Sequence, residues 1–121
     1  MTDATWEQIK NKGKNLNEAV NASPARLKRA WHEFKIICQE YSNNNGFVTR
    51  ELENTLKSRN KKRSEVMILD HGCGGGLISL YLIAIGYSGV HGVNVNDEVK
   101  NLNKIFETLG HSQQNKFFQI K

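Results

Sequence analysis

The chain has 121 residues, which is enough for one small domain with a modest core. Hydrophobic residues make up 38% and charged residues 24%, which is ordinary for a soluble protein, and the single proline excludes a Pro-rich linker. The longest apolar run, "LISLYLIAI", is far shorter than the roughly 20 residues that span a bilayer, and no signal peptide follows Met1. We therefore expect a cytoplasmic protein without a membrane partner.

The net charge of +5 is unevenly distributed along the chain. Residues 1–63 hold 13 of the 17 Lys and Arg but 7 of the 12 Asp and Glu. The densest basic stretch is "KSRNKKR", from Lys57 to Arg63. Such a stretch can bind nucleic acid through the phosphate backbone, but a solvated loop before a buried strand is favoured, because no aromatic residue lies within the stretch.

Residues 1–63 are predicted to form an N-terminal helical cap region. Residues 4–20 place apolar side chains at helical spacing, although Gly13 interrupts the pattern. A second helix is expected to begin at Ser23 and Pro24, an N-cap residue followed by a favoured first helical residue. "SNNNG" should end it, and a third helix is expected over 49–59. The second helix carries an apolar stripe, more typical of core than of a substrate pocket: Leu27, Trp31, Phe34, Cys38 and Tyr41.

The second half of the chain changes to an alternating pattern. "EVMILD" is an apolar run ending in an acid, as expected for a strand covered on both faces of a parallel sheet. A glycine turn, an apolar helix over 75–85, the strand "GVHGVNV", an amphipathic helix from Val99 to Leu109 and the strand "KFFQI" follow. The order β-α-β-α-β predicts an α/β fold in which residues 64–121 form a Rossmann-like half-domain with parallel strands.

The glycine turn limits the kind of ligand that the second half can bind. Glycines between a strand and a helix allow a ligand to lie against bare backbone beside the helix N-terminus. A phosphate-binding loop of the Walker type needs a lysine, and none occurs between Gly72 and Ser88. The dinucleotide pattern G-x-G-x-x-G, begun at Gly72, needs a third glycine where Leu77 stands. An NAD-dependent oxidoreductase is therefore disfavoured.

Instead, the sequence has an acid followed by three glycines at alternate positions: Asp70, Gly72, Gly74 and Gly76. "ILDHGCGGG" resembles the glycine-rich motif of class I S-adenosylmethionine-dependent methyltransferases, whose usual form is two hydrophobic residues followed by D-x-G-x-G-x-G. The resemblance covers about 64–121 and implies an incomplete class I sheet. It also implies that the loop backbone contacts S-adenosyl-L-methionine and that Asp70 binds its ammonium group.

The end of the second strand departs from that family. There the resemblance implies an acid that binds both ribose hydroxyls, but "VHGVNV" places Asn94 at this position. An amide oxygen accepts a weaker hydrogen bond than a carboxylate does. Asp97 is the nearest carboxylate, and we expect it to cap the following helix. The predicted cofactor-binding residues are Asp70, His71, Gly72, Cys73, Gly74, Gly76 and Asn94.

Cysteine and histidine suggest little further chemistry. Cys38 and Cys73 lack the spacing of a redox pair and are expected to be free thiols. Cys73 has no base placed for it, so packing is favoured over nucleophilic catalysis. His71, beside Asp70, either contacts the cofactor or fills space. The histidines are scattered without zinc-ligand spacing, so no metal site is predicted.

The expected function is methyl transfer from S-adenosylmethionine to an unidentified acceptor, with catalytic residues that the sequence does not reveal. The alternative is a truncated, non-catalytic methyltransferase-like module that acts by self-association or partner binding. A sheet that ends at "KFFQI" exposes an unpaired strand edge, which proteins normally cover. We therefore expect either a homo-oligomer or a missing C-terminal half.

Overall fold

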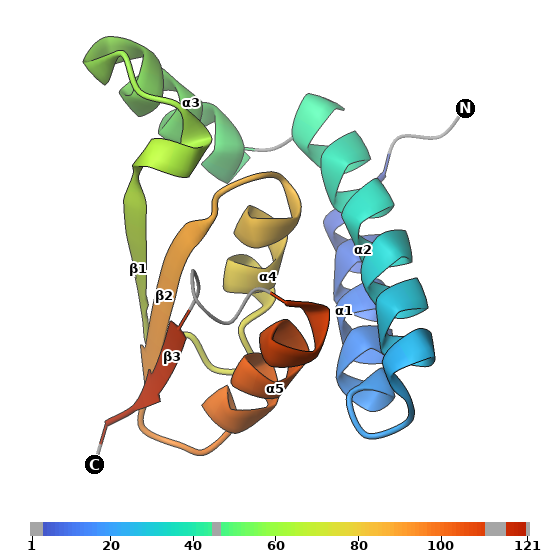
Figure 1. The fold of residues 1–121 in the computed structure, drawn as a ribbon. Coiled ribbons are helices and arrows are strands. Elements are labelled where there is room, and N and C mark those ends of the chain that lie inside the picture. Colours follow the sequence, from blue (N-terminus) through green and yellow to red (C-terminus); the bar gives the residue numbers. More distant parts are fainter. Residues whose placement is uncertain (1–3, 45–46, 111–115, 121) are drawn as a thin grey trace.

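The architecture is α/β, with helices grouped on one side of a small parallel sheet (Figure 1). A computed structural model of the chain describes residues 4–44, 47–110 and 116–120. The elements in chain order are α1 (Trp6–Ala19), α2 (Pro24–Asn44), α3 (Phe47–Arg59), the short 3-10 helix η1 (Arg63–Glu65), β1 (Met67–His71), α4 (Leu77–Ala84), β2 (Gly89–Asn94), α5 (Val99–Leu109) and β3 (Lys116–Gln119). The predicted β-α-β-α-β order is confirmed.

The three strands are parallel and lie in the order β1-β2-β3. Asp70 pairs with Gly92 across β1 and β2, and Gly92 pairs with Phe117 across β2 and β3. Because paired residues of neighbouring strands point to the same face, these three lie on one side of the sheet. That side is covered, since Phe117 is 3% exposed and its ring stacks on Phe106 of α5.

Helix α4 is the centre of the fold. It lies between the sheet and the α1–α2 pair (Figure 1), and all its residues from Ser79 to Ala84 are buried. A helix that is apolar all round is suited to burial on every side, and α4 is buried in this way from Ser79 onward, although Ile78 in its first turn is 39% exposed. Gly13, the residue that interrupted the pattern of α1, lies where α1 meets α4: a Cβ there would be 2.8 Å from a methyl group of Leu77. The glycine allows the two helices to approach.

The starts of α1 and α2 are capped by side chains. Thr5 and Gln8 form a reciprocal capping box at α1. At α2 the hydroxyl of Ser23 accepts a 3.1 Å hydrogen bond from the backbone N–H of Arg26, as its N-cap position predicted. The expected break at "SNNNG" was placed too early, because α2 continues through Ser42 to Asn44. Local propensity for a turn gives way here to continued helical hydrogen bonding.

One hydrophobic cluster joins the two halves of the chain. It includes the stripe of α2, of which Phe34 and Cys38 are fully buried and Trp31 is 7% exposed. The ring of Trp31 meets Phe106 of α5 edge to face, with ring centroids 5.8 Å apart. The stripe is therefore core, and the helical region and the sheet region share it.

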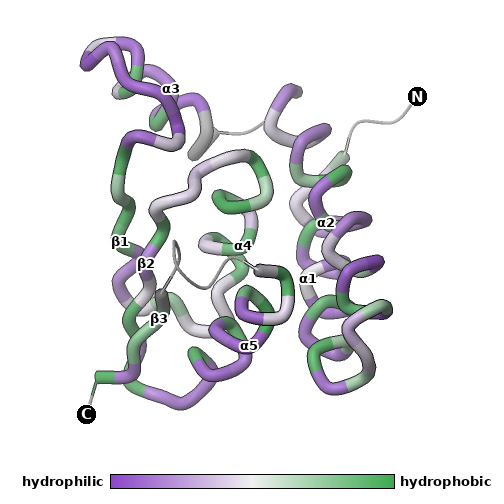
Figure 2. The backbone as a smooth tube through the Cα atoms, viewed as in Figure 1, coloured by the Kyte–Doolittle hydropathy of each residue, from purple (hydrophilic) through white to green (hydrophobic). Residues whose placement is uncertain are grey.

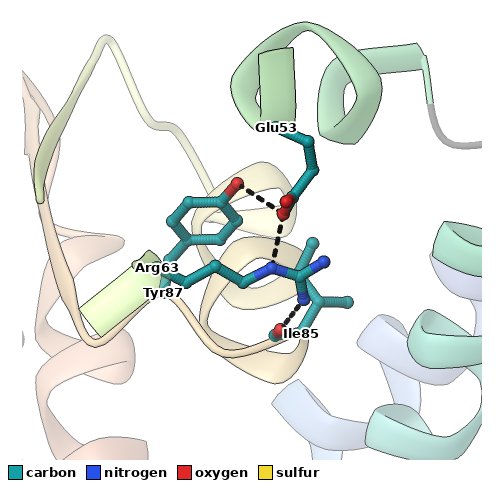
Figure 3. Close-up of polar contacts among 4 residues, drawn as sticks. All are labelled: Glu53, Arg63, Ile85 and Tyr87. Atoms are coloured by element: carbon teal, nitrogen blue, oxygen red, sulfur yellow. Dashed lines mark hydrogen bonds and ion pairs between the residues drawn. The ribbon is translucent and has the colours of Figure 1, made fainter. Parts of the chain in front are cut away.

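Helix α3 is attached to the rest of the fold by a polar cluster (Figure 3). The carboxylate of Glu53 accepts hydrogen bonds from Nε of Arg63 at 2.5 Å and from the hydroxyl of Tyr87 at 3.2 Å. The guanidinium of Arg63 also donates to the carbonyl of Ile85 and lies 5.5 Å from the Tyr87 ring centroid. Arg63 is therefore half-buried and engaged in contacts within the fold, whereas Lys61 and Lys62 of the same basic stretch are exposed.

The opposite side of the sheet carries no covering helix in the described part of the chain (Figure 1). The expectation that "EVMILD" is covered on both faces is wrong: Met67 is 79% exposed and Leu69 is 64% exposed. An apolar run predicts that a strand is suited to burial, but it does not reveal what lies over each face. Figure 2 shows apolar residues on this bare strand. No helix within 4–44, 47–110 and 116–120 is long and apolar enough to cross a membrane.

Candidate functional site

The site is the glycine loop from Gly72 to Gly76, at the carboxyl ends of β1 and β2, where open α/β sheets bind ligands. The backbone carbonyl of Val93 accepts hydrogen bonds from the N–H groups of Gly72 at 2.8 Å and Cys73 at 3.0 Å. These two bonds fix the loop to the end of β2. Among the described residues, none accepts a hydrogen bond from the N–H of Gly74 or Gly75, so both can donate to a ligand.

The loop glycines serve two different purposes. Gly72, Gly74 and Gly76 have φ angles of 70°, 55° and 80°, in the left-handed region that favours glycine. A Cβ on Gly72 would meet no atom within 4 Å, and one on Gly74 would only touch a carboxylate oxygen at 4.0 Å. A Cβ on Gly76 would lie 2.5 Å from both methyl groups of Leu102. Gly72 and Gly74 therefore border open space, whereas Gly76 allows α5 to pack against the loop.

Asp70 is the penultimate residue of β1 and lies on the covered face of the sheet. Its Oδ2 atom accepts a 2.6 Å hydrogen bond from the hydroxyl of Ser79, which is fully buried in α4. The bond ties α4 to the sheet directly behind the glycine loop. Asp70 is half-buried, and its other oxygen, Oδ1, has no hydrogen bond to the described residues. One carboxylate oxygen is thus structural and the other is free to bind a ligand.

Glu98 brings a second carboxylate to the loop. One of its oxygens would lie 3.6 Å from a Cβ on Gly75 and 4.0 Å from one on Gly74. Sequence reasoning missed this residue, because the resemblance directed attention to the end of β2 at Asn94. Glu98 follows that position by four residues, at the start of α5, and the turn between them brings its side chain back to the loop.

Asn94 ends β2 but is engaged with its own turn. Its side-chain N–H donates a 2.8 Å hydrogen bond to Oδ1 of Asn96, which also accepts a 3.1 Å bond from the backbone N–H of Glu98. Asn96, and not Asp97 as expected, therefore supplies the side-chain oxygen at the start of α5. Oδ1 of Asn94 has no partner among the described residues and can accept a hydrogen bond from a ligand.

Cys73 packs and is poorly suited to act as a nucleophile. Its sulfur lies 2.9 Å from where a Cβ on Gly92 would be, so the absence of a side chain at Gly92 makes room for it. Burial and the negative charges of Asp70 and Glu98 raise the pKa of the Cys73 thiol. That result also places the loop in the electrostatic field of both carboxylates.

His71 does not join the loop residues on their side of the sheet. It follows Asp70 directly in β1, so its side chain points to the opposite, uncovered face, where it is exposed. In the part of the chain that the structure describes, no three His, Cys, Asp or Glu side chains are grouped to hold a metal ion.

A cavity of about 590 Å³ adjoins the loop. Cys73, Gly75 and Gly76 form its wall on the loop side, and Lys10 and Lys14 of α1 lie on the other. The volume is within the usual range for small-molecule sites. The charged side chains that line the cavity are Lys10, Lys14 and Glu18 of α1, whereas the carboxylates of Asp70 and Glu98 lie outside it, near the other loop residues.

Comparison of the chain with models of protein families, with curated proteins and with solved structures found no match in any of the three.

Proposed function

We propose that residues 64–121 form a Rossmann-like half-domain that binds S-adenosylmethionine, and that the protein takes part in methyl transfer. Support comes from three features: the D-x-G-x-G-x-G sequence of the loop, its position at the carboxyl end of a parallel sheet, and the open space beside Gly72 and Gly74. Glycine loops of this kind can bind several classes of cofactor. The charged side chains beside this loop favour S-adenosylmethionine over a cofactor that contains a pyrophosphate.

The observation that carries the proposal is the pair of carboxylates at the loop. The side chain of Glu98 lies against Gly74 and Gly75, and Asp70 lies immediately before the loop. A pyrophosphate at these glycines would be repelled by Glu98, since like charges a few ångströms apart disfavour each other. Hydroxyl groups and an ammonium group are instead favoured, because a carboxylate accepts strong hydrogen bonds from both.

The amino-acid part of the cofactor also suits the charged side chains around the loop. Its ammonium group pairs with the free oxygen of Asp70, and its carboxylate is compatible with Lys10 and Lys14, which line the cavity beside Gly75 and Gly76. In this proposal Glu98, with Oδ1 of Asn94, accepts the ribose hydroxyls and thereby replaces the acid missing at position 94. The cofactor supplies a methyl group that its sulfonium already activates, so this chain need only bind and orient it.

The test is a thermal-shift panel on the 121-residue chain. S-adenosylhomocysteine at about 100 times its dissociation constant should stabilise the fold by about 2.7 kcal/mol, whereas NADH and ATP should not stabilise it. Glu98→Gln should weaken the binding of S-adenosylhomocysteine about tenfold, because a charge-assisted hydrogen bond contributes about 1.5 to 3 kcal/mol. Glu107→Gln is the matched control, since this exposed acid lies at the far end of the same helix.

Two results would refute the proposal. One is stabilisation by NADH without stabilisation by S-adenosylhomocysteine. The other is equal binding by Glu98→Gln and Glu107→Gln, which would mean that the carboxylate at the loop does not contact the ligand.

A further inference from the structure

The side of the sheet away from α4 and α5 combines apolar, aromatic and basic residues. Strand pairing and strand alternation define this side, which we call the open face, and no acid is among its strand residues: Met67, Leu69, His71, Gly89, His91, Val93, Lys116 and Phe118. Met67 is 79% exposed, Leu69 64% and Phe118 50%, and His71 is exposed as well. In the described part of the chain no helix covers this face, so a partner can reach it.

The basic stretch that precedes β1 lies next to the open face. Helix α3 ends at Arg59, and the turn after it leads through η1 into β1, whose first residue, Met67, belongs to the open face. Figure 1 shows the end of α3 and this turn beyond the amino-terminal end of β1, directed away from α4 and α5. We call the exposed cations of this segment the basic turn: Lys57, Arg59, Lys61 and Lys62.

The charges of the basic turn are not used within the described part of the fold. None of its four cations forms an ion pair with a described residue. Glu65, the acid that follows in sequence, accepts a 3.0 Å hydrogen bond from the backbone N–H of Lys62 instead. The helix dipole accounts for Lys57 and Arg59 in the last turn of α3, but Lys61 and Lys62 lie beyond the helix. Unpaired cations this close together favour an anionic partner.

The arrangement of residues on the open face narrows the class of that partner. In the strand register His91 lies in the middle of the face, between Leu69 on β1 and Lys116 on β3. A bilayer or an apolar protein surface would remove the polar residues at the centre of the face from water without hydrogen-bond partners, which is costly. A nucleic acid satisfies both kinds of residue, because its bases offer flat rings while its phosphates and base edges accept hydrogen bonds.

We propose that the open face and the basic turn together bind single-stranded nucleic acid. His71 pairs with Val93, and Val93 pairs with Phe118, so the two aromatic residues lie in one row across the sheet, about 10 Å apart. Each ring stacks on a separate base, while the phosphates contact the basic turn, including Lys61 and Lys62. The aromatic residues that the basic stretch lacks in sequence are thus supplied by β1 and β3.

Single strands are favoured over duplexes, because a duplex keeps the faces of its bases stacked on one another. RNA and DNA share the bases and phosphates that this interaction uses. The inference is independent of the proposed cofactor site, since Asp70 and the side chains that hold the loop lie on the other side of the sheet.

The test is fluorescence anisotropy with the 121-residue chain and labelled oligouridine and oligothymidine of about 12 nucleotides. A DNA duplex of the same length and vesicles that contain phosphatidylserine are titrated in parallel. Phe118→Leu keeps an apolar side chain but removes the ring, and Ile36→Ala is its control, because Ile36 is 52% exposed on α2, away from the sheet. Far-UV circular dichroism establishes that each variant is folded.

A second pair of variants tests the basic turn. Lys61→Gln combined with Lys62→Gln removes two charges from it, and Lys28→Gln combined with Lys100→Gln removes the same charge from exposed positions on α2 and α5. Four phosphate contacts predict that the logarithm of the binding constant falls with the logarithm of the salt concentration at a slope of about −3, since each contributes about 0.7. The Lys61 and Lys62 variant should reduce this slope by about 1.4, and its control should leave it unchanged.

We expect the single strands to bind more tightly than the duplex, and Phe118→Leu to weaken their binding about tenfold with an unchanged salt slope. Binding of either single strand supports the proposal, and the tighter of the two identifies the nucleic acid. Absence of binding to both single strands, or equal affinity for the duplex, would overturn it. Binding of the vesicles alone would assign the surface to a membrane, and equal losses in the two double variants would show that the basic turn has no specific role.

Full affinity in Phe118→Leu would likewise overturn the proposal, because leucine retains the apolar contact and lacks only the stacking ring.

Discussion

Replacing Gly76 with alanine should destabilise the fold far more than replacing Gly74, although both glycines belong to the same loop. Both have positive φ angles, 80° at Gly76 and 55° at Gly74, so a Cβ costs about 1 to 2 kcal/mol at either position. The new methyl group on Gly76 would also lie 2.5 Å from both methyl groups of Leu102, which is itself fully buried. Forcing an extra carbon into a packed core costs a further 1 to 3 kcal/mol or so.

The expected totals are therefore about 1 to 2 kcal/mol for Gly74→Ala and about 2 to 5 kcal/mol for Gly76→Ala. Urea unfolding of the ligand-free chain measures both, with the free energy taken from the midpoint and an unchanged slope. Gly74→Ala should in return weaken the binding of S-adenosylhomocysteine, because its methyl group enters the open space. If Gly76→Ala costs no more stability than Gly74→Ala, the assignment of Gly76 to packing and Gly74 to the ligand is wrong.

Three further predictions concern single side chains. Burial and the charge of Glu53 raise the pKa of Tyr87 from 10.0 to about 12, so the stability that the neutral Tyr87 hydroxyl contributes should hold below pH 10 and be lost between pH 10 and 12. Alkaline urea unfolding of the Tyr87→Phe variant checks this, because a variant whose free energy of unfolding falls equally over that range would contradict it. Iodoacetamide should modify Cys73 more slowly when S-adenosylhomocysteine is bound, and an unchanged rate at Cys73 would place the ligand elsewhere. Cys38, which is fully buried and has a pKa raised to about 12, should stay unmodified in both states by mass spectrometry. Ser79→Ala should lower the free energy of unfolding by about 1 to 3 kcal/mol, because it removes the hydrogen bond to Asp70, and a loss of ligand affinity without a loss of stability would show that Ser79 belongs to the site instead.

The order of elements in the second half was predictable because it rests on local signals. A short apolar strand, a glycine turn and an amphipathic helix each have their own periodicity, and their alternation implies parallel strands. Core positions on α2 were predictable for the same reason, since Phe34 and Cys38 repeat at helical spacing. The role of Gly13 was not, because it depends on the approach of Leu77 from a helix more than 60 residues away.

The site was only partly predictable. The sequence pattern located the loop and Asp70, but it did not separate Gly76 from the glycines that border open space, since that difference comes from Leu102. Nor did it find Glu98, whose approach to Gly75 depends on how the turn after β2 is formed. The bare face of β1 was missed because an apolar run is the same whether or not something covers it. Contacts that form only when distant segments pack together, such as those of Leu102 and Glu98 with the loop, leave no periodic pattern in the sequence.

Calorimetric titration of S-adenosylhomocysteine into the 121-residue chain tests the central claim most directly. We predict saturable binding with one ligand per chain, at least about tenfold weaker in Asp70→Asn, which keeps an oxygen to accept the hydrogen bond from Ser79 but removes the charge. NADH titrated under the same conditions should give no saturable heat. Saturable binding of NADH alone, or full affinity for S-adenosylhomocysteine in Asp70→Asn, would contradict the account.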